Sequence, residues 1–159
     1  MALVTLNEFK IEAGNDRESR DKSMFKLQMK YMLLWTIIER FNFLRYSLGG
    51  TSNDGIKKLA ENLYFQEGLS SPKLNVSIKR PLFRSDDPNE RIDFSVNDSK
   101  KAIQYYYQVR CNVTHRGKGL VQDLDLLKNC YSELHNIINY VLEQTKIECE
   151  QIKQQYNGF

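Results

Sequence analysis

Residues 124–145 read LDLLKNCYSELHNIINYVLEQT, and this stretch decides the fold. Its apolar residues recur at alternating spacings of three and four, which places them on one face of an α-helix. The members of that face are Leu124, Leu127, Tyr131, Leu134, Ile138, Val141 and Thr145. The pattern predicts a long amphipathic helix whose apolar periodicity weakens over residues 148–155.

A second long helix is expected over residues 18–48, where apolar residues recur at spacings of three, four and seven. These are Met24, Leu27, Tyr31, Leu34, Ile38, Phe41 and Leu48. Gly49 and Gly50 then end the run. Trp35, Met24, Met29 and Met32 are interpreted as packing residues, and part of their face would suit a dimer interface.

Two further helices complete the predicted set. One is capped within Ser52, Asn53 and Asp54 and ends near Gly68. The other is capped by Asn97 or Asp98, carries Ile103, Tyr106, Tyr107 and Val113, and ends at Gly117 and Gly119. With this much helix and little strand signal, we predict an all-α fold, an antiparallel helical bundle with a long proline-bearing loop insertion.

The chain of 159 residues is expected to form a single domain. Residues 1–17 suggest an N-terminal arm, extended and followed by a turn. Residues 67–96 hold all three prolines and are interpreted as a surface loop, with a short strand through Leu74, Val76 and Ile78. A loop of this length often binds something, so Lys79, Arg80 and Arg84 are either contacts for RNA or a partner, or ordinary solvated residues.

Composition restricts the function only loosely. The 23 basic and 20 acidic residues give a net charge of +3, which permits an anionic partner without requiring one. Neither an export signal nor a membrane helix is indicated, so we expect a cytoplasmic protein with no membrane partner. Cys111, Cys130 and Cys149 form no metal-ligand spacing, and we expect buried or half-buried thiols, no metal and no cofactor.

The strongest candidate for chemistry is the stretch from Arg110 to His115. His115 stands among cationic residues, which favours an anion such as phosphate and a neutral imidazole near pH 7. On an unbroken helix, five residues turn through about 500°, so Arg110 and His115 would point about 140° apart. Either the helix ends near them, or another element, such as an antiparallel second protomer, completes the site. Asn112 lies three residues before His115 and can share a face with it.

The run Tyr107-x-x-Arg110-Cys111-Asn112-x-x-His115-x-Gly117-Lys118 resembles the signature of the HEPN superfamily. That signature is Arg, four intervening residues and His, at the end of one helix of an all-α bundle. The trailing Gly-Lys resembles a subset found in bacterial defence and abortive-infection proteins. The resemblance covers about a dozen residues, together with the expected layout of long helices before and after the motif.

The resemblance implies a metal-independent endoribonuclease, a toxin or defence effector that acts as a homodimer with a composite site and has a possible antitoxin or defence partner protein. His115 would take the proton from a ribose 2′-OH and Arg110 would stabilise charge on the phosphate. Asn112 would orient the phosphate or the imidazole. Such a reaction requires RNA and leaves a 2′,3′-cyclic phosphate. Arg116, Lys118 and Tyr107 are the expected RNA-binding residues, the first two through the phosphate backbone.

The sequence departs from the common pattern at Cys111, where Asn, His or Asp often follows the Arg. A thiol is a poor hydrogen-bonding substitute, so either Asn112 takes over the polar role or activity is reduced. The alternative function is a noncatalytic helical module that binds nucleotide, RNA or protein, in which Arg110 and His115 only cap a helix and bridge two helices.

Two other groups of residues have mainly structural interpretations. His135, within the last helix, is interpreted as a surface or boundary residue. Tyr105, Tyr106 and Tyr107 cannot all face one cleft, since successive helical residues point about 100° apart. The sequence therefore favours core positions for most of the three tyrosines.

Overall fold

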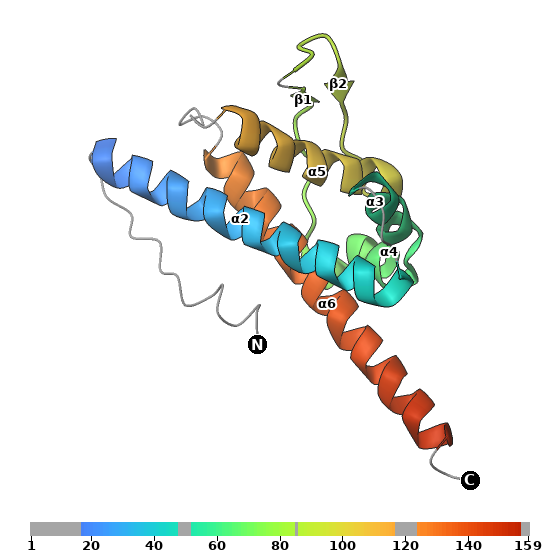
Figure 1. Cartoon of the computed structure of the whole chain (residues 1–159). Coiled ribbons are helices and arrows are strands. Elements are labelled where there is room, and N and C mark those ends of the chain that lie inside the picture. The colour runs from blue at the N-terminus through green and yellow to red at the C-terminus, as the bar shows by residue number, and fades with distance from the viewer. Residues whose placement is uncertain (1–16, 48–51, 85, 117–123, 157–159) are drawn as a thin grey trace.

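A computed structural model describes residues 17–47, 52–84, 86–116 and 124–156 of the chain, except for the side chains of 17–19, 52, 115 and 116 (Figure 1). Five α-helices lie in this part: α2 (Arg17–Tyr46), α3 (Ser52–Glu61), α4 (Leu63–Ser70), α5 (Ser99–Arg116) and α6 (Leu124–Tyr156). The predicted all-α fold is confirmed. The arm expected over 1–17 lies outside the described residues, except that Arg17 already belongs to α2.

The three long helices pack around one apolar core. In Figure 1, α2 lies in front of α6, and α5 lies beside both near the start of α6. The fully buried side chains include Leu27, Tyr31, Leu34, Trp35, Ile38, Leu59, Phe65, Ile103, Tyr105, Tyr106, Leu134 and Ile137. The periodic apolar residues of the sequence therefore supply most of the core, although Met29 faces solvent with 47% of its surface exposed.

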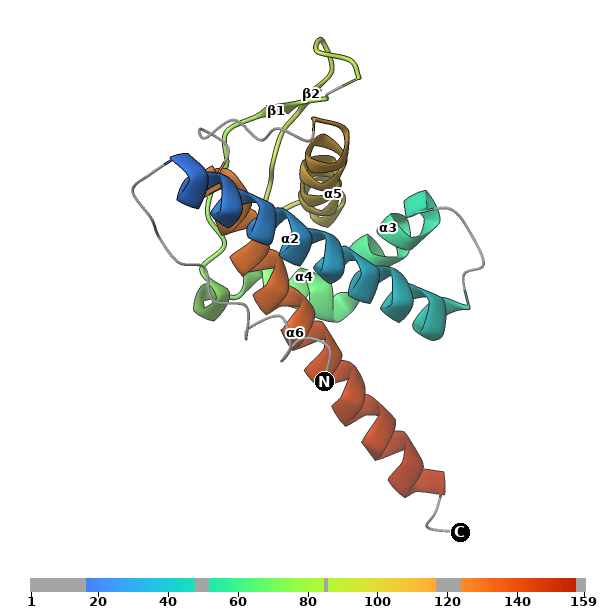
Figure 2. The same cartoon turned by 60° about the vertical axis from the view of Figure 1, so that its left-hand side comes forward.

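The helix directions differ from a simple antiparallel arrangement. Lys30 lies over the ring of Tyr131, and Arg45 pairs with Glu148, so α2 and α6 run in the same direction. Of the three long helices, α5 runs opposite to the other two (Figure 1). The helix α6 continues through residues 148–155, where its apolar periodicity weakens, and its last part extends beyond the other helices (Figure 2). No helix in the described ranges is long and apolar enough to cross a membrane.

The single helix expected from Ser52 to Gly68 is two helices, and Asn62 separates them. The Asn62 backbone is extended, with φ −68° and ψ 124°, and its side chain accepts a hydrogen bond from the Phe65 N–H at 3.0 Å. Its Nδ2 donates to the Tyr46 hydroxyl at 2.8 Å, which anchors the break to the end of α2. An asparagine in this position is a good N-cap, so the break has a local cause.

Gly68 does not end a helix, because α4 continues to Ser70. It is buried, and a Cβ atom added there would lie 3.1 Å from Ile137 Cγ2 on α6. The glycine therefore allows α4 and α6 to approach closely.

The segment 67–96 is partly packed on the bundle, and its strand lies elsewhere than predicted. Leu74 ends a 3₁₀ turn (Pro72–Leu74), and Ile78 is 90% exposed. The strands are β1 (Leu82–Phe83) and β2 (Arg91–Ile92), which pair antiparallel. The apolar alternation over residues 74–78 does not produce a strand, because the Asn75 backbone is in the left-handed region, with φ 48°, and turns the chain away from an extended path.

A buried carboxylate fixes this segment to α6. Glu133 accepts hydrogen bonds from the Ser77 N–H at 3.1 Å, the Ser77 hydroxyl at 2.7 Å and the Tyr106 hydroxyl at 3.0 Å. It also forms an ion pair with Lys79, whose side chain is 2% exposed and whose ammonium lies 4.0 Å from the centroid of the Phe94 ring. Each donor satisfies charge that would otherwise be buried without a partner.

Candidate functional site

The motif found in the sequence lies on the C-terminal half of α5. The helix begins where Asp98 accepts hydrogen bonds from the N–H groups of Lys100 and Lys101, both at 3.1 Å, which confirms one of the two predicted caps. It continues to Arg116, so it does not end between positions 110 and 115. Those positions therefore lie about 140° apart around the helix axis. Because α5 ends at Arg116, one residue after His115, a helix end near the motif and completion of the site by another element both stay predictions.

Arg110 faces α2. Its Nη2 donates to Glu39 Oε1 at 3.2 Å, and its Cζ lies 5.4 Å from the centroid of the Tyr107 ring. The arginine side chain is 24% exposed and that of Glu39 is 46% exposed. The buried Arg110 Nε has no hydrogen-bond partner among the residues that the structure describes. The guanidinium is thus held at one end by Glu39, while part of it still meets solvent.

Tyr107 and Thr114 lie on the same face of α5 as Arg110. The Tyr107 ring packs edge-on against Trp35, with 5.4 Å between centroids, and is only half buried. The Thr114 hydroxyl donates to the Arg110 carbonyl at 2.9 Å and lies 3.5 Å from Met32 Sδ. Residues three, four and seven apart therefore join α5 to α2 along one line.

Asn112 faces a different direction from Arg110. Its Nδ2 donates to the Phe83 carbonyl of β1 at 3.0 Å, and its Oδ1 accepts from Gln108 Nε2 at 2.9 Å. Two residues along a helix correspond to a turn of about 200°, which explains the separation. The structure therefore uses Asn112 to hold β1 against α5, and does not bring it together with Arg110.

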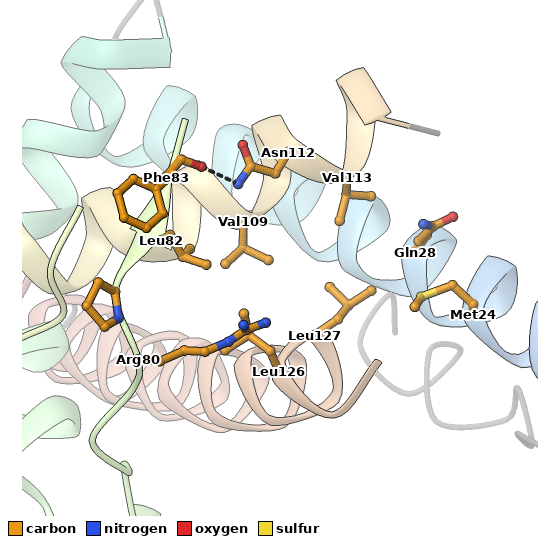
Figure 3. A pocket seen from close by; sticks show the side chains of 11 residues that line it. Met24, Gln28, Arg80, Leu82, Phe83, Val109, Asn112, Val113, Leu126 and Leu127 are labelled. Carbon is orange, nitrogen blue, oxygen red and sulfur yellow. Dashed lines mark hydrogen bonds between the residues drawn. The ribbon is translucent and has the colours of Figure 1, made fainter. Parts of the chain in front are cut away.

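A pocket lies on the Asn112 side of α5 (Figure 3). Its walls come from four elements and are mostly apolar: Met24, Gln28, Arg80, Pro81, Leu82, Phe83, Val109, Asn112, Val113, Leu126 and Leu127. Its volume is about 190 Å³. Small-molecule sites usually measure roughly 300–1,000 Å³, so this one suits a single side chain or part of a ligand.

The remaining motif residues are only partly described. His115 and Arg116 belong to α5, but their side chains lie outside the described part, and Lys118 lies outside it altogether. Their roles therefore stay predictions.

Several other predicted residues have a clear outcome. The prediction that His135 is a surface or boundary residue is wrong, because it is 7% exposed and its ring lies 5.6 Å from that of Tyr131. In the described part of the chain, its Nε2 has no hydrogen-bond partner. Neither interpretation of Lys79 holds, because its side chain is buried with Glu133. Tyr105 and Tyr106 are core residues as favoured, and burial, with Glu133 nearby, raises the pKa of Tyr106 well above its usual value.

The three cysteines occupy three different environments. Cys111 is half buried and Cys130 is buried, as expected, whereas Cys149 is exposed, which the sequence did not predict. Burial raises the pKa of the Cys130 thiol to about 12, so this thiol stays protonated at neutral pH.

Glu39 is the site residue that sequence reasoning missed. It lies on α2, far from the motif in sequence, and nothing in its immediate neighbours signals a partner on α5. Only the packing of α2 against α5 brings the pair together. Within the described ranges, no group of three or more His, Cys, Asp or Glu side chains is placed to hold a metal ion.

Comparison with models of known protein families, with curated proteins and with solved structures gives no match to this chain.

Proposed function

We propose that this protein is a metal-independent endoribonuclease of the HEPN type, a cytoplasmic toxin or defence effector that cleaves RNA by attack of the ribose 2′-OH. The proposal rests on the motif from Arg110 to His115 and on the all-α bundle that presents it. The observation that carries it furthest is the placement of Arg110. The guanidinium is partly exposed, lies against Tyr107 and Glu39, and within the described residues donates one hydrogen bond, to Glu39.

Arg110 is suited to a phosphate in this position. A guanidinium has five N–H donors in a planar fork and binds phosphate oxygens in pairs. The single bond to Glu39 at 3.2 Å uses one of these donors, and the pair is exposed enough to exchange with a ligand. A backbone phosphodiester of RNA carries one negative charge, as the Glu39 carboxylate does, and would offer two non-bridging oxygens to the same guanidinium donors.

In the proposed reaction, His115 accepts the proton of the 2′-OH as the oxygen attacks the adjacent phosphorus. Arg110 stabilises the negative charge that develops on the phosphate oxygens. The bond from phosphorus to the 5′-oxygen of the next nucleotide breaks, and that oxygen takes a proton from water. The products are a 2′,3′-cyclic phosphate and a 5′-hydroxyl. Asn112 takes no direct part, since both of its polar groups bind within the chain. Arg116 and Lys118 contact backbone phosphates.

A second candidate function is a noncatalytic module that binds RNA, nucleotide or protein. The ion pair between Arg110 and Glu39 favours it, because it joins α5 to α2 as a purely structural bridge would. The two functions differ in one respect: only the enzyme changes the covalent structure of RNA.

The test is cleavage of a mixed RNA pool in excess EDTA, with the product ends mapped. We expect wild-type protein to leave 2′,3′-cyclic phosphate ends, and His115→Ala and Arg110→Ala to leave the RNA intact. Loss of a general base lowers rates by about 10²–10⁴-fold. Arg45→Ala is the matched control, because Arg45 also forms an ion pair between helices, with Glu148, and is 33% exposed.

The control should cleave like the wild type. RNA that binds to the wild type and stays intact would support the noncatalytic module. Cleavage that survives in His115→Ala would remove this histidine from the mechanism.

A further inference from the structure

The pocket beside the motif helix has the size and lining of a site for one flat, weakly polar ring. Its volume of about 190 Å³ is below the roughly 300–1,000 Å³ of ordinary small-molecule sites, so it takes one ring system and not a whole nucleotide. Figure 3 shows Leu82 and Val109 on one side of the space, and Leu126 and Leu127 on the opposite side. Apolar side chains are therefore placed to cover both faces of a flat ligand.

Gln28 gives this pocket its available hydrogen-bonding group. Its side chain lies at one end of the space and is half buried (Figure 3). Within the part of the chain that the structure describes, no hydrogen bond joins the Gln28 amide to another residue. The Asn112 amide in the same lining is occupied, since it donates to Phe83 and accepts from Gln108. Gln28 therefore presents a donor next to an acceptor to any ligand in the pocket.

Adenine is the RNA base that fits this combination. It has no carbonyl oxygen, so burying its ring between apolar walls leaves fewer polar atoms without a partner than for guanine, cytosine or uracil. Its amino group lies next to a ring nitrogen, and a glutamine amide binds that donor and acceptor with two hydrogen bonds. Phe83 lines the same pocket with 48% of its surface exposed, and an aromatic ring offers a surface on which a base stacks. The lining therefore favours adenine over the other three bases.

The two helices beside the pocket carry more positive charge than the whole chain. The helix α2 has seven basic and three acidic residues, and α5 has four basic residues and no acidic one. Together they carry a formal charge of +8, whereas the net charge of the whole chain is +3. The exposed basic residues of these helices include Arg20, Lys22, Lys26, Arg40, Lys100 and Lys101. This separation of charge favours a polyanion along α2 and α5 over an uncharged or acidic partner.

A line of contacts connects the pocket to the motif. Four residues of α2 at spacings of four, three and four share the face toward α5, namely Gln28, Met32, Trp35 and Glu39. The last three of them contact, in turn, Thr114, Tyr107 and Arg110. We call this line of residues the α2–α5 seam. Gln28 and Glu39 lie about 16 Å apart along α2, so an extended strand of a few nucleotides spans the pocket and the Arg110 guanidinium.

We propose that this pocket binds one unpaired adenine of an RNA strand whose backbone lies along the α2–α5 seam. The inference deepens the proposed function and rests on it for the role of Arg110 at the cleaved bond. An adenine held in the pocket fixes which phosphodiester reaches Arg110, so the pocket makes cleavage depend on sequence. A free adenine nucleotide carries the same base, and competition by AMP distinguishes it from RNA.

The first test is the binding of short single-stranded oligomers, measured by fluorescence anisotropy in EDTA. Each oligomer is 2′-O-methylated, which blocks attack by the 2′-OH, and consists of uridine with adenosine, purine riboside or uridine at its centre. Purine riboside lacks only the amino group of adenosine. Wild-type protein is expected to bind the adenosine oligomer about tenfold more tightly than either of the others, the size expected for a bidentate contact to a base. Equal binding of the three oligomers would overturn the proposal.

The second test removes the amide. Gln28→Leu is expected to bind the adenosine and purine riboside oligomers equally, with its affinity for the uridine oligomer unchanged. Gln144→Leu is the matched control, because Gln144 is also half buried and lies about 25 Å further along α6 than Leu127. The control should keep the tenfold preference. A Gln28→Leu protein that also keeps it would remove this amide from recognition and refute the proposal.

A variant that fills the pocket tests the space itself. Val113 lines the pocket and is half buried, so the larger side chain of Val113→Phe should occupy part of the volume. We expect loss of the adenosine preference, unchanged binding of the uridine oligomer and unchanged helix content by circular dichroism. A folded Val113→Phe protein with the full preference would mean that adenine binds elsewhere.

Competition with AMP separates the two sources of adenine. AMP lacks the neighbouring phosphates that α2 and α5 would contact. It should therefore displace the labelled adenosine oligomer only at concentrations at least about tenfold above those of the unlabelled oligomer. Displacement by AMP and by the oligomer at equal concentrations would make the pocket a site for a free nucleotide and contradict the assignment to RNA.

Mapping of the cleaved ends separates this inference from the proposed function. Cuts at a fixed distance from adenosine in the wild type, and no such preference in Gln28→Leu, would support both. Preferential binding of adenosine with the RNA pool left intact would support the pocket and contradict the ribonuclease. Cleavage by the wild type at positions unrelated to adenosine would support the ribonuclease and contradict the pocket.

Discussion

Two of the ion pairs that join the long helices to their neighbours differ in almost every physical respect. Glu133 and Lys79 are 10% and 2% exposed, and the carboxylate also accepts hydrogen bonds from Ser77 and Tyr106. Glu39 and Arg110 are 46% and 24% exposed, and they share one hydrogen bond of 3.2 Å. The first pair is enclosed and fully coordinated, whereas the second is open on one side.

The comparison separates a structural contact from one that a ligand can enter. A buried charge that loses its partner costs about 3–5 kcal/mol, so the Glu133 network must stay intact for the segment around Ser77 to remain in place. A partly exposed pair contributes about 0.2–1 kcal/mol, so breaking it to bind an anion costs little. Measurements on each pair can therefore test which one is available for function.

The largest effect is expected for Glu133→Gln. The amide would present a donor toward the Lys79 ammonium or the Tyr106 hydroxyl, and Lys79 would remain buried without a negative partner. We expect the free energy of unfolding to fall by about 3–5 kcal/mol in chemical denaturation.

Glu143→Gln supplies the control for that substitution, because Glu143 lies on the same helix and is exposed. Its effect should stay below about 0.5 kcal/mol. Adding Lys79→Met to Glu133→Gln should recover part of the lost stability, since it removes the unpaired charge. A Glu133→Gln protein as stable as the wild type would show that the network is not structural.

The second effect is expected for Tyr106→Phe, which removes one donor to the same carboxylate. Hydrogen bonds to charged groups contribute about 1.5–3 kcal/mol when buried, and we expect a loss of that size. Tyr140→Phe offers a close match, since the Tyr140 hydroxyl donates to Glu67 at 3.0 Å on the surface. Equal losses in the two variants would contradict the importance we assign to burial.

The sequence predicts the helices of this fold well and its contacts poorly. Apolar spacing identifies α2, α5 and α6, and Asp98 identifies the start of α5, because these features depend on nearby residues. The break at Asn62 was missed although the signal is local: an asparagine followed three residues later by Phe65, whose N–H it caps. Apolar periodicity alone does not reveal this break, because the helical spacing of apolar residues continues on both sides of Asn62.

The candidate site shows the same division. The motif on α5 was found from a short run of residues, whereas the Glu39 partner and the orientation of Asn112 depend on how α2 and β1 pack against that helix. Lys79 and Glu133 are separated by 54 residues, and no local pattern pairs them. Contacts of this kind follow from tertiary packing, which hydrophobic periodicity does not specify.

A third prediction concerns Lys30, a buried lysine that contrasts with Lys79. In the described part of the chain, no ion pair joins Lys30 to a carboxylate, and burial lowers its pKa from 10.5. The folded protein therefore destabilises the charged form of Lys30, whereas the unfolded chain keeps its ordinary pKa of 10.5. The free energy of unfolding should rise as the pH increases toward 10.5, because the folded protein releases this proton first. Lys30→Met should raise the free energy of unfolding at pH 7 by up to about 1 kcal/mol, with the gain shrinking at alkaline pH.

Denaturation of both proteins between neutral and alkaline pH measures this difference. A Lys30→Met variant that is less stable than the wild type at neutral pH would mean that the ammonium has a favourable partner.

The smallest stability effect is expected for the pair on the surface. Glu39→Gln and Arg110→Gln should each change the free energy of unfolding by less than about 1 kcal/mol, and a double-mutant cycle should give a coupling of about 0.2–1 kcal/mol that falls with added salt. The two substitutions should change RNA binding in opposite directions. Glu39→Gln removes the carboxylate that competes with phosphate for Arg110. This variant should therefore bind RNA up to about fivefold more tightly, which corresponds to the upper end of the same coupling energy. Arg110→Gln should bind more weakly. If both substitutions weaken binding equally, Glu39 and Arg110 act as a structural bridge between α2 and α5, and the phosphate site must lie elsewhere on the molecule.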